Sequence, residues 1–156
     1  MPEFDEFERK ILALLQENCR YSVAELAERV GLSTSPCWRR LKRLEEIGVI
    51  RGRVALLDAR SIGLNASAYV RVSLIDHSAE SIDRFLNFVE HQPNIVDCAT
   101  ITGNSDFMLK VVAEDPEDLE RFMMRDLLAT GLIRGSSTNF ILRQIKNHSK
   151  LPLPKS

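Results

Sequence analysis

The sequence contains few of the features that mark membrane, secreted or metal-binding proteins. No apolar run in its 156 residues approaches the roughly 18 residues that a membrane-spanning helix requires. The three cysteines, Cys19, Cys37 and Cys98, are odd in number and include no CxxC pair, so neither a zinc site nor a disulfide framework is predicted. Residues 1–6 carry three carboxylates and no basic residue, so this segment lacks the basic and apolar regions of a signal peptide. We therefore expect a cytoplasmic protein without a metal and without membrane association.

Enzyme motifs are also missing. The sequence has no glycine-rich phosphate loop, no G-x-S-x-G and no HExxH. His77, His91 and His148 are isolated, with no cysteine or carboxylate at metal-ligand spacing. The carboxylates gathered at residues 115–120 fit the start of a helix, where the helix dipole stabilises negative charge. No catalytic site and no cofactor are predicted.

Positive charge is not in excess over the whole chain, but it gathers in one segment. The net charge is −1 and the pI is about 6.3, well below the value of about 9 that is typical of a nucleic-acid-binding domain. Between Ser33 and Arg53, however, six basic residues stand against Glu45 and Glu46, which leaves a local charge of +4. Any case for DNA binding must come from this segment.

Up to about residue 50 the apolar residues recur at helical spacing. A first helix is predicted to open at residues 5–8, which resemble a capping signal. A second opens at residues 22–25, Ser-Val-Ala-Glu, a capping box, and ends at Gly31, which tolerates the left-handed conformation. A third is predicted to start with Ser35 as its N-cap and Pro36 as its first residue. Two short helices joined by a glycine-containing turn, the second of them basic, are typical of a helix-turn-helix.

The third predicted helix has two different faces. Cys37, Leu41 and Leu44 recur at i, i+4 and i+7 and form an inner stripe. Residues off this stripe face outward, where the major groove of DNA would lie. Arginine can bond guanine O6 and N7 together, whereas lysine and backbone amides hold phosphates. The predicted DNA-binding residues are Ser33, Ser35, Pro36, Trp38, Arg39, Lys42, Arg43, Arg51 and Arg53.

Position along the helix divides these contacts into two kinds. The N-terminal residues of such a helix reach base edges, so Ser35, Trp38 and Arg39 are the predicted base readers. Lys42 and Arg43 lie one turn later and are better placed for the DNA backbone. The arginines that follow could touch flanking phosphate, as a wing does.

Alternatives remain open for this segment. Four basic residues within five positions can simply form a solvated helix face. Trp38 could pack back on the first helix, and Arg40 could pair with Glu8 or Glu45 at the helix junction. A strand is predicted at residues 51–57.

In the second half of the chain, period-two alternation and helical spacing take turns. The predicted strands are residues 68–74, 95–102, 107–112 and 138–145, and the predicted helices begin near residues 79 and 116. The order β-α-β-β-α-β is the ferredoxin-like arrangement, in which both helices cover one face of a four-stranded sheet. Valine, phenylalanine and tyrosine are frequent in these strands, so we expect a second subunit to cover the other face.

Residues in both halves resemble the Lrp/AsnC (feast/famine) regulators. The first half is similar in residues 26–33, in residues 40–45 and in Gly48-Val49-Ile50, and residues 102–107 are similar to the family's effector-loop signature, Gly-x-x-Asp between two strands. The resemblance covers roughly residues 4–146. It implies a winged helix-turn-helix followed by a ligand-binding α+β domain, homodimers that assemble into octamers, and an amino acid as effector.

The resemblance also implies that the effector binds near the Gly-x-x-Asp loop, at a contact between dimers. We carry this over to Gly103, Asn104 and Asp106. A glycine in the turn lets a backbone amide approach a carboxylate, and Asp106 could accept a hydrogen bond from an ammonium group. Alternatively, Asp106 is a hairpin-turn residue that bonds its own backbone. The sequence departs from the family at Ser105, where an aromatic is frequent, and at Glu8, where aspartate is frequent.

The predicted protein is thus an α+β regulator of transcription. A winged helix-turn-helix at residues 1–52 binds double-stranded DNA, residues 53–65 form a strand and linker, and residues 66–156 form the effector-binding and oligomerisation domain. A small effector, an amino acid by resemblance, would modulate the control of amino-acid metabolism genes. The alternative is a metabolite-sensing or assembly module whose N-terminal helices dock a protein.

Overall fold

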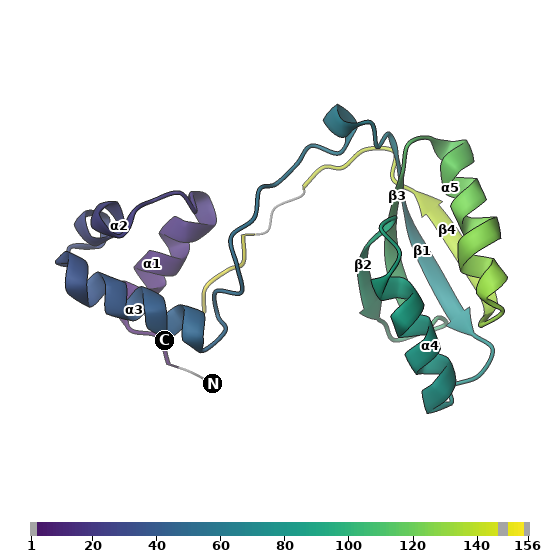
Figure 1. Ribbon diagram of the computed structural model, residues 1–156, viewed down its shortest axis with the longest axis horizontal. Helices are drawn as coiled ribbons and strands as arrows, with labels where there is room; N and C mark the ends of the chain where they lie inside the picture. Colours follow the sequence, from purple (N-terminus) through teal and green to yellow (C-terminus); the bar gives the residue numbers. More distant parts are fainter. Residues whose placement is uncertain (1–2, 147–149, 155–156) are drawn as a thin grey trace. The chain divides into compact units, whose positions relative to one another are not determined.

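Three helices packed around one apolar core form the first of two units in the chain (Figure 1). The computed structural model describes residues 3–146 and 150–154. The helices are α1 (Glu6–Glu17), α2 (Val23–Val30) and α3 (Thr34–Glu46). The buried core residues between them are Ile11, Leu12, Leu26, Ala27, Val30, Cys37, Leu41 and Leu44. The inner stripe predicted for the third helix is therefore confirmed.

Side-chain caps fix where α1 and α2 begin. In α1, Asp5 accepts a hydrogen bond from the Glu8 amide and Glu8 accepts one from the Asp5 amide. Ser22 and Glu25 form the same reciprocal pair at the start of α2. α2 ends at Gly31, whose φ of 76° lies in the left-handed region. Both predicted caps and the predicted glycine stop are confirmed.

Two local predictions in this half are wrong. α3 has Ser33 as its N-cap and not Ser35, so Pro36 occupies the third helical position. Proline is tolerated there because the first amides of a helix have no partner within it. Residues 51–57 form neither a strand nor a helix. A strand requires a neighbour for its backbone groups, and none pairs with this segment in the described part of the chain.

The described end of the chain, residues 150–154, belongs to the helical unit. The side chain of Gln16 in α1 forms two hydrogen bonds with the backbone of Leu151. Its Oε1 accepts a hydrogen bond from the Leu151 amide at 2.6 Å, and its Nε2 donates one to the Leu151 carbonyl at 3.2 Å. Lys150 forms an ion pair with Glu17 at 2.7 Å. Leu153 packs against the apolar core. This tail lies within the range 66–156 predicted for the C-terminal domain, and its described residues contact the helical unit.

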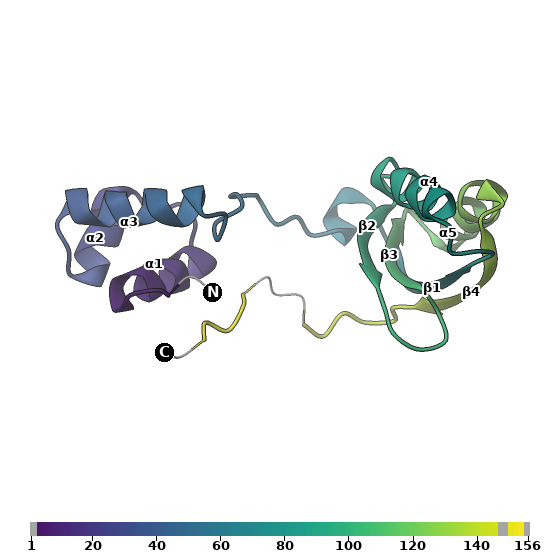
Figure 2. The same cartoon turned by 90° about the horizontal axis from the view of Figure 1, so that it is seen from below.

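A four-stranded antiparallel sheet with helices on one face forms the second unit. The strands are β1 (Ala66–Leu74), β2 (Ile95–Thr100), β3 (Phe107–Ala113) and β4 (Ile133–Phe140), arranged in the order β2-β3-β1-β4. The two longer helices are α4 (Ala79–Glu90) and α5 (Pro116–Phe122), and α5 continues as a π-helical turn, Met123–Leu127. Figure 2 shows α4 and α5 on the same side of the sheet. The predicted α+β fold and its element order are confirmed.

The position of the last strand differs from the prediction. β4 spans Ile133–Phe140, whereas residues 138–145 were the predicted strand. β4 consists mostly of exposed polar residues and is held by its ladder to β1, in which Ser137 lies opposite Arg71. Its apolar pattern is therefore a poor guide to its bounds. Residues 141–145 lie beyond the sheet, and Leu142 is 90% exposed.

The two faces of the sheet differ in chemistry. The face beneath the helices carries the buried apolar residues of β1 and β3, among them Val70, Val72 and Leu109. On the opposite face, Tyr69 pairs with Lys110 and Arg71 pairs with Met108. Most strand valines and phenylalanines thus face the helices, so their frequency is not evidence for an apolar free face. The number of apolar strand residues therefore does not by itself indicate whether a second subunit covers this face.

Shortening the tail residue that reaches the core tests whether the tail stabilises the helical unit. Leu153→Ala removes apolar surface from a half-buried position, so we expect the free energy of unfolding to fall by about 1 kcal/mol. Urea unfolding followed by the fluorescence of Trp38, the single tryptophan, reports on this unit. The matched control is Leu151→Ala, because the Leu151 side chain is 71% exposed. Equal stability of the two variants would contradict a packed tail.

Candidate DNA interface and ligand pocket

The outward face of α3 presents the predicted base readers to solvent. Trp38 is 49% exposed, which argues against packing on α1. Ser35 and Arg39 are exposed on the same helix, and Ser33 is exposed at its N-cap. Pro36 is half-buried, and its carbonyl accepts a hydrogen bond from Arg40 at 3.4 Å. The structure thus brings four of the five predicted N-terminal contacts to one exposed helix start.

Glu45 holds two of the basic residues predicted to contact phosphate. Lys42 lies 2.9 Å from its Oε2 and Arg53 lies 3.1 Å from its Oε1. All three side chains are partly exposed, and such pairs contribute only about 0–1 kcal/mol. Phosphates can therefore compete for these cations. Arg39 and Arg51 have no hydrogen-bond or ion-pair partner in residues 3–146 and 150–154.

Arg40 and Arg43 are held by the start of α1. Arg43 Nη1 lies 2.5 Å from Glu8 Oε1, and Arg40 Nε lies 2.9 Å from Asp5 Oδ2. Partial burial raises the pKa of Asp5, but the hydrogen bond from the Glu8 amide and the Arg40 guanidinium together bring it below its ordinary value. Arg40 thus pairs with Asp5, and not with Glu8 or Glu45 as the sequence suggested.

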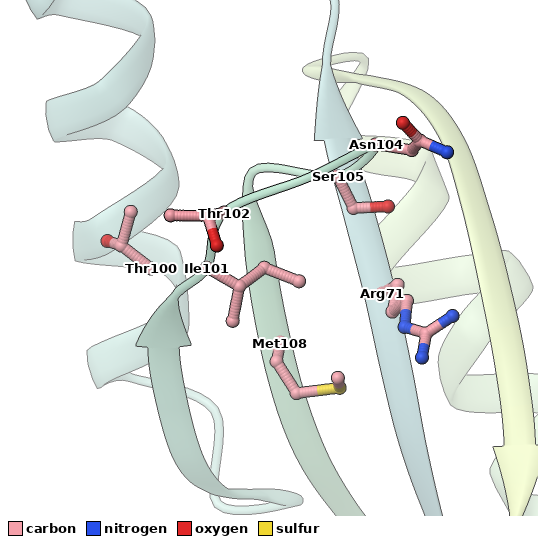
Figure 3. Close-up of a pocket in the computed structure, with 7 residues that line it drawn as sticks. All are labelled: Arg71, Thr100, Ile101, Thr102, Asn104, Ser105 and Met108. Atoms are coloured by element: carbon pink, nitrogen blue, oxygen red, sulfur yellow. The ribbon is translucent and has the colours of Figure 1, made fainter.

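A pocket of about 650 Å³ opens on the free face of the sheet, beside the loop between β2 and β3. Figure 3 shows Arg71 of β1 and Met108 of β3 on neighbouring strands, with Ile101 and Ser105 close by. The side chains that line it are Arg71, Thr100, Ile101, Thr102, Asn104, Ser105 and Met108. Of the three predicted effector residues, Asn104 alone appears among them.

Asp106 does not line this pocket. Its Oδ2 accepts the Leu74 amide at 2.8 Å, and its Oδ1 lies 3.0 Å from Nε2 of His77. The hydrogen bond with His77, followed by that from the Leu74 amide, holds the pKa of Asp106 below its ordinary value. Gly103, with φ of 109°, turns the loop and also lies outside the lining. The carboxylate of Asp106 therefore ties the loop to the end of β1, and neither oxygen is left without a donor.

The sequence reasoning missed most residues of this pocket. Arg71 was a charged residue at an outward position of an alternating strand, but the sequence does not reveal that Met108 lies opposite it. Thr102 and Ser105 lie within the stretch 102–107 that resembles the effector loop, but they were not among the predicted effector residues.

The described residues contain neither a cluster of metal-ligating side chains nor a membrane-spanning helix. No group of three or more histidine, cysteine, aspartate or glutamate side chains there could hold a metal ion. No helix in that part of the chain is long and apolar enough to cross a membrane. His148 lies outside the described residues.

Comparison with known proteins assigns both units. Residues 4–51 match the winged helix-turn-helix DNA-binding family, and residues 67–151 match the Lrp/AsnC ligand binding domain. The chain belongs to the Lrp/AsnC family of transcriptional regulators. Lrp/AsnC proteins are DNA-binding regulators and not enzymes, so the helical unit is a DNA-binding unit and the sheet unit a ligand-binding domain.

Relatives match over nearly their whole length. The chain is 38% identical over 149 residues to the DNA-binding transcriptional activator DecR of Escherichia coli K12, covering 96% of this chain and 98% of that protein. It is 34% identical over 154 residues to the glutamate uptake regulatory protein of Zymomonas mobilis, covering 99% and 93%. A transcriptional regulator of Neisseria meningitidis, solved as a complex with L-Met, has a TM-score of 0.91 and 36% identity over 96% of this chain and 97% of that one.

Two variants of α3 separate base reading from phosphate binding. Arg39→Ala is expected to weaken binding to a duplex selected from a random pool by about 1–3 kcal/mol, and to weaken binding to random duplex less. Lys42→Ala, its control on the same helix, should weaken both duplexes alike and give a shallower salt dependence. Fluorescence anisotropy titrations over a range of salt concentrations measure both effects. Equal losses on both duplexes for Arg39→Ala would remove it from the base readers.

Because the pKa of Asp106 is lowered in the folded protein, the contribution of Asp106 to the free energy of unfolding depends on pH. A carboxyl group with a lowered folded-state pKa stabilises the fold above its unfolded pKa of about 3.9, and this contribution is lost as pH falls through the folded value. Asp106→Asn should therefore be less stable than the unmodified protein at neutral pH, with the difference shrinking on acidification. Urea unfolding followed by circular dichroism across this range measures it, with exposed Asp97→Asn as control. A difference that stays constant with pH would contradict the assignment.

Proposed function

We propose that this regulator reads a specific DNA site with α3 and that an amino acid, bound in the sheet pocket, modulates this binding to control genes of amino-acid metabolism. The observation that supports the sensing half most directly is the exposed guanidinium of Arg71 at the border of the pocket. Two relatives favour the same ligand class, because one is a glutamate uptake regulator and the other was solved with L-Met.

For DNA, the proposed roles follow the exposure of the basic residues and their partners. Ser33, Ser35, Trp38 and Arg39 contact base edges or the adjacent backbone from the start of α3, with Pro36 beside them. The remaining predicted residues contact phosphates, and these are Lys42, Arg43, Arg51 and Arg53. Arg39 supports this division because its guanidinium is exposed and has no competing partner in the described residues.

For the ligand, the pocket offers a match to each part of an amino acid. Arg71 can hold a carboxylate with two parallel hydrogen bonds. Ile101 and Met108 provide apolar surface for a side chain. Asn104 and Ser105 offer neutral oxygens for the ammonium group. We assign Gly103 and Asp106 to the shape of the loop, since the carboxylate of Asp106 already accepts the Leu74 amide.

The family's assembly suggests how the exposed surfaces are used. We propose a homodimer that assembles further to an octamer, in which a second copy covers the free face of the sheet. Tyr69 on this face, together with the exposed Val54, Leu56 and Leu57 of the connecting segment, supplies apolar surface for such contacts.

A thermal-shift screen over the amino acids tests the sensing proposal. A ligand that binds the folded state raises Tm by mass action. We expect Arg71→Gln to weaken the effective amino acid about 10- to 100-fold, because a charge-assisted hydrogen bond contributes about 1.5–3 kcal/mol. Arg84→Gln removes the same charge from an exposed position on α4, away from the pocket and from the free face, so it should respond like the unmodified protein. No shift with any amino acid would refute the sensing proposal, and an unchanged Arg71→Gln response would refute its anchor.

A further inference from the structure

The capping box of α1 also contacts the DNA-reading helix. Each of its two carboxylates uses one oxygen for the cap and the other for an arginine of α3. Glu8 accepts the Asp5 amide with Oε2 at 3.0 Å and Arg43 with Oε1. Asp5 accepts the Glu8 amide with Oδ1 at 2.7 Å and Arg40 with Oδ2. The arrangement joins the start of one helix to the basic face of another.

Glu8 is unusual in its burial. It is 4% exposed, and it is the one buried polar or charged residue in the described part of the chain. A buried carboxylate must be paired and hydrogen-bonded to be tolerated, and both oxygens of Glu8 are. The cap and the ion pair together hold the Glu8 side chain in place.

Arg43, in contrast, is buried at one end only. Its side chain is 45% exposed, although its Nη1 is bonded to Glu8. A guanidinium has five N–H donors, and within the described residues only Nη1 of Arg43 has a hydrogen-bond partner. The rest of the group borders a surface depression that it shares with Arg39 and Arg40. Arg43 can therefore keep its bond to Glu8 and still donate to a phosphate.

Arg40 has a different role. It donates to Asp5 and to the Pro36 carbonyl, and its guanidinium carbon lies 5.3 Å from the centre of the Phe7 ring. These contacts hold α3 against α1 and occupy the group on several sides. Of the two arginines that the capping box binds, Arg43 is the one left open to DNA.

We propose that Glu8 is a positioning residue for DNA recognition, which fixes the Arg43 guanidinium before DNA arrives. Ordering a long side chain on binding costs conformational entropy, and a preformed Glu8–Arg43 pair removes this cost at the phosphate that Arg43 contacts. The bond also sets the place of that phosphate relative to the base readers on the same helix. Glu8 thereby favours correctly registered DNA, although its own charge repels DNA. The inference rests on the proposed phosphate contact of Arg43.

Glu8→Gln isolates this role because it keeps an oxygen for the cap and removes the charge. We expect affinity for the selected duplex to fall about three- to tenfold, while affinity for random duplex stays equal or rises. The control is Glu45→Gln, which removes the same charge from a partly exposed partner of Lys42 and should strengthen both duplexes alike. Affinities are compared at equal folded fraction, measured by Trp38 fluorescence.

A double-mutant cycle with Arg43→Gln shows whether Glu8 acts through Arg43. If it does, the double variant should bind the selected duplex no worse than Arg43→Gln alone. Additive losses would overturn the positioning role and leave Glu8 as a structural residue only. Equal strengthening of both duplexes by Glu8→Gln would also overturn it, since Glu8 would then act by charge alone. If Arg43→Gln changes neither affinity nor salt dependence, the phosphate contact fails first.

Discussion

The ion pair between Glu8 and Arg43 is the contact on which the DNA-binding unit depends. It joins the first turn of α1 to the last turn of α3, two of the three helices that share the apolar core. Loss of one partner of such a pair costs more than the pair contributes, because the other charge is left desolvated. One set of hydrogen bonds therefore fixes the start of α1, the packing of α1 against α3 and the position of the Arg43 side chain.

The features that sequence could predict are those decided within a few residues. The reciprocal caps at Ser22 and Glu25, the stop at Gly31 and the inner stripe of α3 depend on local spacing. The start of α3 was misplaced by two residues because Ser33 and Ser35 are both good N-caps and Pro36 fits any early helical position.

Errors appeared where distant partners decide the outcome. Whether residues 51–57 form a strand, and where β4 begins, depends on which backbone lies alongside, and apolar alternation does not encode this. The same holds for the ligand site. The loop motif identified its neighbourhood, but Asp106 bonds Leu74, 32 positions away in the chain, and Arg71 reaches the pocket only through its register with Met108. A carboxylate that looked available in the sequence is satisfied in the fold.

The docked tail makes the DNA-binding unit discontinuous in sequence, since the ligand-binding unit, Leu56–Ile145, lies between its two segments. Docking therefore closes a loop that contains an entire folded unit. While that unit is folded, the loop is effectively short; if it unfolds, the same ends are joined by a long flexible chain, and closure costs more entropy. Folding of the sheet unit can thus lower the entropy cost of docking the tail on the helical unit, through the connection of the chain alone. A ligand that stabilises the sheet unit would, by this route, also help to keep the tail on α1.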